Sequence, residues 1–446
     1  MIVATMARST PSWNRRRILG GLGAAALFHG RPGLAQSPVN QPLRLEATTR
    51  RLALRRGAAP TEIWSIERAG ADPASTLRVP VNTPVVVNAG NALSNAIALH
   101  WTGVSEKAVE PLLGRPLLAP HTSETFEIIY RYPGIFTCDM RLMAGASNPP
   151  SGLLPVIVED PAEKAWAADL DEVFLVEDWR LRPDGSGLSP PTDLSANEPI
   201  FTVNRQLTPD LLGRQFDRLR LRFINGCQRS VIAIKIENID LRVMALDGLP
   251  AEPFPARNGA LLLAPGSRAD TLVDMTAGAG SSATILLHDG KEARPIARLV
   301  TSGDRPVRSA PLPPPALSAA RSPAAPDLKI ARRFEVPPLN SSESWMTPTG
   351  FAPAKPAFRA RAGDTVVLAL ANKGGQPVTF HLHGQHFRLL DRLDDGWKPF
   401  WLERLAMAPG EAQRIAFVAE HTGRWLIEAM EADWRSPRLL SWYEVG

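Results

Sequence analysis

Cysteine and histidine are scarce in this chain of 446 residues. It holds two cysteines, Cys138 and Cys227, and eight histidines. Two cysteines so far apart do not indicate a disulfide framework, and we expect two buried free thiols. The sequence also lacks a glycine-rich phosphate loop, a Ser-His-Asp order and a nucleic-acid motif. The common phosphate-binding, serine-hydrolase and nucleic-acid-binding classes are therefore not indicated.

Long apolar runs are also missing. The longest candidate, residues 18–28, is too short to span a bilayer as a mature helix. It follows adjacent arginines, Arg15 and Arg16, and precedes a small-residue cleavage site ending at Ala35. This order resembles a twin-arginine export signal, so we predict that residues 1–35 are removed. We expect a periplasmic protein with no integral membrane segment in its mature chain.

A net charge of one sign is absent once this signal is removed. The whole chain has 50 basic and 45 acidic residues, a balance of +5. Residues 1–35 contain five arginines and no acidic residue, which leaves 45 basic against 45 acidic residues. The high isoelectric point thus reports the signal and does not indicate nucleic acid as a partner.

What the sequence has is proline, glycine and short strand patterns. The 42 prolines and 33 glycines punctuate runs of alternating apolar and polar residues, whereas helical periodicity is weak. Many short strand patterns along the chain predict an all-β protein made of consecutive β-sandwiches. A Pro/Ala-rich stretch without apolar periodicity reads as a linker. We predict a signal at 1–35, domains at 42–160, 161–302 and 334–446, and a linker at 303–333.

Eight phrases in order resemble the multicopper oxidases built from three cupredoxin domains. They are LHWTG, YPGIFTCDMR, SGLLPVIVED, LRFINGC, ALDGLP, APGSRADTLV, HLHGQHF and GRWLIEAMEADWRSPRLL. The resemblance covers nearly the whole mature chain. It implies three consecutive cupredoxin-like Greek-key β-sandwich domains and, in the family, copper-based oxidation.

The resemblance also implies where the copper ligands should stand. The blue-copper histidines, cysteine and methionine of the family fall on Val378, Ala429, Trp434 and Leu439. Since a blue-copper site needs a thiolate and two imidazoles, these residues predict that the site is lost. This argues against laccase-type oxidase activity.

The family's trinuclear cluster keeps three of its eight histidines here. His100, His381 and His383 occupy ligand positions, whereas the other five hold Thr102, Asp139, Arg141, Glu428 and Met430. His100 and His381 match the two positions of the single type 2 copper. The sequence allows two interpretations of these three histidines, one with a bound metal and one without.

In the first reading, the three histidines bind one divalent metal such as copper, with Asp139 or Glu428 as a carboxylate ligand. In the second, they hydrogen-bond in a polar core without a cofactor, and Arg141 pairs with Asp139 or Glu428. Arginine cannot ligate a metal, so the second reading is favoured unless Arg141 turns away. His386 is predicted to be a packing or surface residue.

The favoured function is a periplasmic scaffold that has lost copper redox chemistry and binds a protein partner. A copper-free, twin-arginine-exported branch of the superfamily supports cell division, and this chain resembles it in signal, domain plan and ligand loss. The alternative is a divergent copper-binding oxidoreductase with one residual metal site. A copper store is disfavoured, because the nine methionines form no methionine-rich run.

Overall fold

The computed structural model describes residues 42–446, apart from 72–75, 105–109, 161–165, 167, 194–197, 315–321, 342–343, 353–354 and 393–395. The predicted export signal, residues 1–35, lies outside the described residues. Within the described part the regular secondary structure consists of β-strands and three short 3-10 helices. These helices are η2 (Arg141–Met143), η3 (Arg257–Gly259) and η4 (Pro348–Gly350). The prediction of an all-β chain is confirmed.

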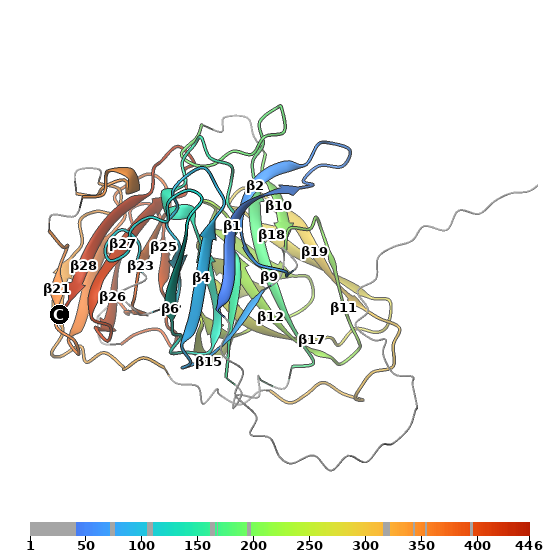
Figure 1. The fold of residues 1–446 in the computed structure, drawn as a ribbon. Helices are drawn as coiled ribbons and strands as arrows, with labels where there is room; N and C mark the ends of the chain where they lie inside the picture. The colour runs from blue at the N-terminus through green and yellow to red at the C-terminus, as the bar shows by residue number, and fades with distance from the viewer. Residues whose placement is uncertain are drawn as a thin grey trace, which may run out of the picture. The chain divides into compact units, whose positions relative to one another are not determined.

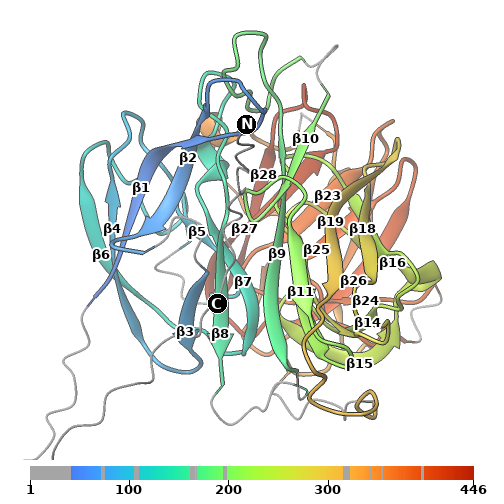
Figure 2. The same cartoon turned by 90° about the vertical axis from the view of Figure 1, so that its right-hand side faces the viewer.

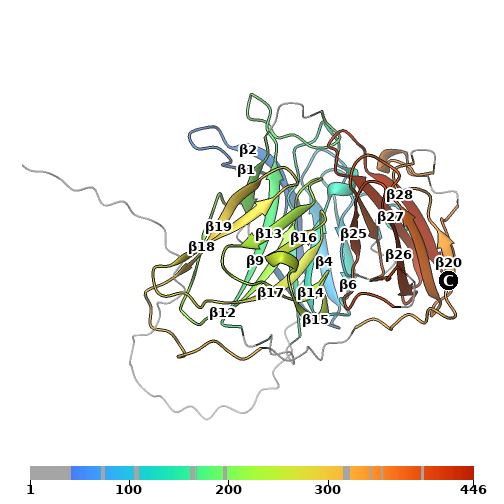
Figure 3. The ribbon, with the colours of Figure 1, turned by 180° about the vertical axis from the view of Figure 1, so that it is seen from behind.

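The strands form three consecutive pairs of sheets, seen as blue, green-yellow and orange-red groups in Figures 1 and 3. The first sheet pair has the orders β2-β1-β4-β6 and β3-β8-β7-β5. Its strands are β1 (Leu43–Leu52), β2 (Thr61–Arg68), β3 (Leu77–Pro80), β4 (Val85–Asn91), β5 (His100–Trp101), β6 (Ser123–Ile128), β7 (Gly134–Asp139) and β8 (Leu154–Glu159).

The second sheet pair has the orders β10-β9-β12-β17-β14-β15 and β11-β19-β18-β13-β16. Its strands are β9 (Leu170–Trp179), β10 (Ile200–Val203), β11 (Asp210–Gly213), β12 (Arg218–Asn225), β13 (Ile232–Ile236), β14 (Arg242–Leu246), β15 (Leu249–Pro255), β16 (Ala260–Leu263), β17 (Arg268–Asp274), β18 (Ser282–His288) and β19 (Ala293–Thr301).

The third sheet pair has the orders β20-β22-β26-β24 and β21-β28-β27-β23-β25. Its strands are β20 (Arg332–Glu335), β21 (Arg359–Ala360), β22 (Thr365–Ala371), β23 (Val378–Leu382), β24 (Arg388–Leu389), β25 (Arg404–Met407), β26 (Ala412–Val418), β27 (Gly423–Glu431) and β28 (Leu439–Val445).

Each sheet pair encloses its own apolar core, because successive side chains of a strand point to opposite faces. Strand β12 shows this: Leu219, Leu221 and Phe223 enter the second core. The alternate residues, Arg218, Arg220 and Arg222, are buried on the other face and pair with aspartates. Both cysteines are free and buried, as predicted, and each packs in a core.

The first two sheet pairs pack directly against each other. Ile135 and Ile157 on β7 and β8 join Val173 on β9 in one buried cluster, and Figure 2 shows β8 beside β9. Gly134 permits a close approach at the start of β7. Its φ is +154°, and a Cβ there would lie 2.2 Å from the Gly248 carbonyl oxygen. A larger residue would force the two sheet pairs apart.

A buried polar junction connects all three sheet pairs. Arg268, with 0% exposure, donates to Ile135 O of the first pair at 3.1 Å and to Glu403 Oε2 of the third at 2.6 Å. Glu403 Oε1 accepts the Gly103 N–H at 3.1 Å. His386 joins the junction 3.1 Å from Asp247 O, so it is more than a packing or surface residue. A buried arginine with these partners is satisfied.

Candidate functional site: a buried histidine cluster

Strand alternation in the third sheet pair sets the position of the site. On β23, Val378, Phe380 and Leu382 point into the third core. His381 therefore points to the opposite face, where its Cα partner on β27 is Glu428. The sequence turns after this strand at Gly384, whose φ is +73° and where a Cβ would lie 2.3 Å from the Trp425 ring. Only glycine fits this turn, which leaves His383 at the strand end beside His381.

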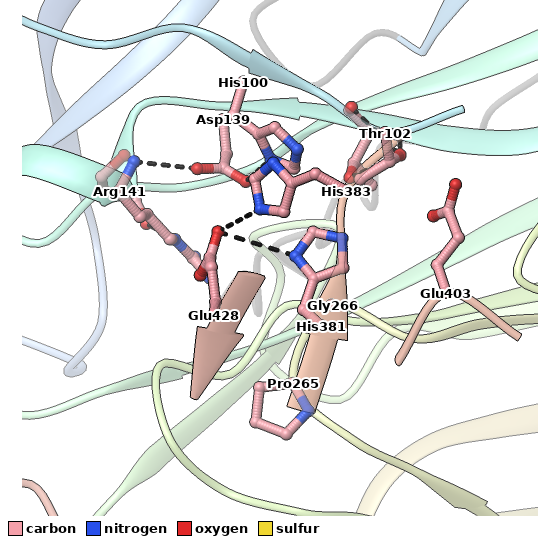
Figure 4. Close-up of polar contacts among 12 residues, drawn as sticks. His100, Thr102, Asp139, Arg141, Pro265, Gly266, His381, His383, Glu403 and Glu428 are labelled. Carbon is pink, nitrogen blue, oxygen red and sulfur yellow. Dashed lines mark hydrogen bonds and ion pairs between the residues drawn. The ribbon is translucent and has the colours of Figure 1, made fainter. Parts of the chain in front are cut away.

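The first sheet pair supplies the third histidine. His100 lies on β5, and its Cα partner on β7 is Asp139. Figure 4 shows His100 and Asp139 from one side meeting His381, His383 and Glu428 from the other. The cluster thus joins residues separated by about 280 positions in the sequence, at the contact of the first and third sheet pairs.

The three imidazoles are close together and buried. The ring centroid of His383 lies 4.2 Å from that of His100 and 4.2 Å from that of His381, and the third separation is 5.3 Å. One ligand atom from each ring lies within 4.8 Å of the other two. The structure therefore brings together the three histidines that the sequence analysis predicted as candidate metal ligands.

Carboxylates surround these rings, and Glu428 is the central one. Its Oε1 is 2.6 Å from His383 Nε2 and 3.6 Å from His381 Nδ1, and its Oε2 pairs with Arg438. Asp139 Oδ2 lies 3.7 Å from His100 Nδ1, which is ion-pair range but too long for a hydrogen bond. Both predicted carboxylates thus face histidines, and Glu428 does so with two of them.

Glu110 is a further carboxylate that the sequence did not nominate. Its Oε1 lies 2.8 Å from His383 Nδ1, an ion-pair contact without hydrogen-bond alignment, and accepts the Leu426 N–H at 3.0 Å. No spacing rule links Glu110 to a histidine motif. Arg438 was also missed, although it adjoins Leu439, which the family resemblance aligns.

The two neighbouring histidines of the cluster differ in their pKa values. Burial lowers the pKa of His383, but Glu110 and Glu428 outweigh it and raise that pKa to about 9. Burial, Arg404 and His383 hold the pKa of His381 well below its ordinary value. Burial opposes ionisation of Glu428, yet Arg438 and the two histidines keep its pKa well below the usual range. At neutral pH the cluster holds a His383 imidazolium, a neutral His381 and a Glu428 carboxylate.

The donor set fits one metal ion. Zinc binds imidazole nitrogens at about 2.0–2.1 Å, so the ligands of one such ion lie within roughly 4.2 Å of each other. The separation of up to 4.8 Å needs a small contraction. His381 Nδ1 is buried without a hydrogen bond, but His383 must release its proton to ligate. In the described part of the chain no other group of three such side chains is placed for a metal.

The expected pairing of Arg141 is wrong. Its guanidinium donates to Ser151 O and Gly226 O, both at 2.8 Å, and lies 3.7 Å from Glu177. Only its backbone N–H reaches Asp139 (Figure 4), at 2.9 Å. Arg438, rather than Arg141, is the cation that balances Glu428. The guanidinium of Arg141 therefore leaves the space between the histidines free of its charge.

The residues aligned with the family's blue-copper ligands are apolar and packed. Val378 and Ala429 are fully buried in the third core, and Leu439 packs against it. Trp434 is buried with its ring 5.3 Å from the guanidinium carbon of Arg180 on the second sheet pair. Neither Val378, Ala429 nor Leu439 carries an atom that can ligate copper.

Three all-β sheet pairs with a histidine cluster between the first and third define a cupredoxin-like multidomain protein. Two family models described as multicopper oxidase match residues 175–287 and 324–432. The curated multicopper oxidase MmcO of Mycobacterium tuberculosis is 23% identical over 274 residues, 52% of each chain. The chain therefore spans about half the length of this curated relative.

Solved structures agree on the fold. A multi-copper oxidase from Pseudomonas thermotolerans has a TM-score of 0.77 at 23% identity, over 92% of this chain and 100% of that one. McoA multicopper oxidase from the hyperthermophile Aquifex aeolicus has a TM-score of 0.74 at 17% identity, over 92% and 97%. This chain belongs to the multicopper oxidase superfamily. At these identities the structural likeness establishes the fold and leaves activity open.

Proposed function

We propose that this protein is an exported, multicopper-oxidase-like scaffold that binds a protein partner in the periplasm without copper-based electron transfer. The observation that carries the proposal is the apolar packing of Val378 and Ala429 in the third core. A blue-copper centre takes electrons one at a time from a reducing substrate through a copper–thiolate bond. An alanine in place of the cysteine removes that bond.

The thiol of Cys138 does not restore the centre. Cys138 lies on β7 in the core of the first sheet pair, at 0% exposure. Burial raises the pKa of its thiol well above the ordinary value, and Asp139 adds to this effect. A buried thiol with a raised pKa is a poor nucleophile, and a copper ion would have to displace its proton in order to bind. Laccase-type turnover is therefore not expected.

The periplasmic location and the partner are part of the same proposal. The twin-arginine-like N-terminus supports export, and in the described residues no helix has the length and apolar character needed to cross a bilayer. The three-domain division at 42–160, 161–302 and 334–446 belongs to this proposal. So does a supporting role in cell division, which rests on the resemblance to the copper-free branch.

A second candidate is a protein with one metal ion at the histidine cluster. The short distances among His100, His381 and His383 favour it. These residues would hold a copper or another divalent ion, with Glu428 as a fourth donor, and the ion would supply Lewis-acid or one-electron chemistry. Glu110 would then orient His383 through Nδ1, since ligating histidines commonly contact a carboxylate by their other nitrogen.

Metal analysis of the mature protein separates the two candidates. The protein is purified after export, incubated with Cu²⁺ and freed of excess ion, and its metal content is measured by mass spectrometry. We expect no stoichiometric metal in the wild type or in His381→Ala, with both folded by circular dichroism. His121→Ala, at an exposed turn, is the matched control.

One equivalent of metal that disappears only in His381→Ala would establish the second candidate and overturn the metal-free one. An intense visible band from a copper–thiolate centre would contradict the loss of the blue-copper site itself.

A further inference from the structure

A cavity of about 290 Å³ lies where the three sheet pairs meet, next to the histidine cluster but lined by other residues. Its wall comes from η2 and the loop after it in the first pair, residues 190–191 and 228–229 of the second, and η4 with residues 437–438 of the third. This volume lies at the lower end of the range of small-molecule sites.

The charged side chains of this wall are all cationic. Three arginines line it, Arg141, Arg229 and Arg438, and its described lining contains no aspartate or glutamate. The rest of the wall is largely apolar, with Leu142 and Met143 among its residues and a set of prolines. A wall of this kind offers guanidinium donors at one place and apolar contact at another.

Arg229 is the arginine with the fewest partners. It is 4% exposed, its Nη donates to Ser436 O at 3.2 Å, and its Nε is buried without a hydrogen bond. Among the described residues no carboxylate lies within ion-pair distance of it. Burial and the neighbouring charge of Arg438 lower the pKa of Arg229 to about 9, although Glu428 and Asp178 oppose the shift. A buried cation beside another cation, with no carboxylate in direct contact, is costly.

The other two arginines are only partly compensated. Arg438 pairs with Glu428 through one Nη. Arg141 is 8% exposed, donates to two carbonyl oxygens and has Glu177 at 3.7 Å. Burial raises the pKa of Glu177, which weakens that carboxylate as a counter-ion. Of the three guanidinium groups, only that of Arg438 is in a close ion pair among the described residues, with Glu428, whereas Asp139 and Asp178 act on the three arginines from further away.

We propose that this cavity binds a small organic oxyanion, a carboxylate or phosphate monoester whose charged group meets Arg229, Arg141 and Arg438. Guanidinium groups match the planar and tetrahedral oxygens of these anions in charge and geometry. The apolar body of the ligand lies against Leu142, Met143 and the prolines. None of the described lining residues is a histidine, and the cavity shares Arg438 with the surroundings of the histidine cluster, through its ion pair with Glu428.

Calorimetric titration of the mature protein tests the site with inorganic phosphate, phenyl phosphate, benzoate and the neutral analogue phenol. We expect phenyl phosphate or benzoate to bind and phenol not to bind. Arg229→Gln should weaken binding at least tenfold, since a lost charge-assisted hydrogen bond costs that much. Arg51→Gln, at an arginine exposed by 74%, is the matched control and should bind as the wild type does.

Ala146→Trp provides a second variant that keeps every charge. Ala146 lies on the wall and is exposed, so a large side chain there fills the mouth without entering a core. We expect Ala146→Trp to abolish binding. This variant keeps the test valid if Arg229→Gln does not fold. Benzoate binding without phosphate binding assigns a carboxylate, and the reverse assigns a phosphate. Absence of binding by every anion, or binding that both variants leave unchanged, overturns the proposal.

Discussion

Strands β23 and β27 have two faces that differ in chemistry, although neighbouring residues of each strand point alternately to one face and to the other. On the core face, Val378 and Ala429 are apolar and fully buried. On the other face, His381 and Glu428 are also buried but polar, and His381 packs against His100 of the first sheet pair. Because side chains alternate along a strand, one face can lose its polar ligands while the other keeps them.

The comparison shows how each face tolerates burial. The core face is stable because nothing on it needs a partner. The polar face is stable because each charge has one: Glu428 has Arg438 and His383, and His383 also has Glu110. The core face should therefore be destabilised when a charge is added to it, and the polar face when a charge is removed from it.

Val378→Asp should have the largest effect. It places an unpaired carboxylate in the third core, which we expect to lower the free energy of unfolding by about 4 to 5 kcal/mol. Urea unfolding followed by tryptophan fluorescence measures the change. Ala412→Asp, at an exposed position of β26, is the control and should cost little. Equal losses in the two variants would show that Val378 is not surrounded by an apolar core.

Glu428→Gln should have the next largest effect. The change keeps the shape of the side chain but leaves Arg438 and the His383 imidazolium without their shared carboxylate, at a cost of about 3 to 4 kcal/mol. The same urea titration applies. Glu431→Gln, three residues further along β27 and bonded to Ser436, is the control. A stable Glu428→Gln protein would mean that another carboxylate, such as Glu110, carries the charge balance.

The junction that links the sheet pairs gives a pH-dependent prediction. Burial opposes ionisation of Glu403, but Arg268 and His386 lower its pKa from 4.5 to about 2. The folded pKa is thus below the unfolded one, so the ionised carboxylate stabilises the fold fully above pH 4.5. This contribution is lost as the pH falls from 4.5 towards about 2.

We expect Glu403→Gln to be less stable than the wild type by about 2 to 3 kcal/mol above pH 5, with the difference shrinking below pH 4.5. Unfolding free energies measured from pH 7 to pH 3 test this. Glu62→Gln, exposed by 58%, should follow the wild-type curve. A difference that stays constant down to pH 3 would contradict the lowered pKa.

Trp434→Phe should have the smallest effect. The indole Nε1–H is buried without a hydrogen bond among the described residues, so removing it relieves an unsatisfied donor. Phenylalanine keeps an aromatic ring beside Arg180. We expect a change of less than about 1 kcal/mol in the free energy of unfolding. Thermal unfolding of the two proteins side by side measures it, and a large loss would indicate a partner for the indole.

The sequence predicted the site in part. The H-x-H spacing of His381 and His383 on a strand could be read directly, and the family resemblance added His100, Asp139 and Glu428. Glu110 could not be found in this way, since it reaches His383 from a loop of another sheet pair. Arg141 was paired wrongly because its direction depends on two carbonyl oxygens, at Ser151 and Gly226, that no local pattern places.

The sequence by itself determined the all-β fold, the superfamily and the apolar residues on the core face, because strand periodicity and motif order are local properties of the chain. Only the tertiary structure decided which carboxylate and which arginine balance the histidines, and that three arginines share one cavity. Those contacts join residues of different sheet pairs, and the electrostatic free energy of a buried charge depends on neighbours that only folding brings together.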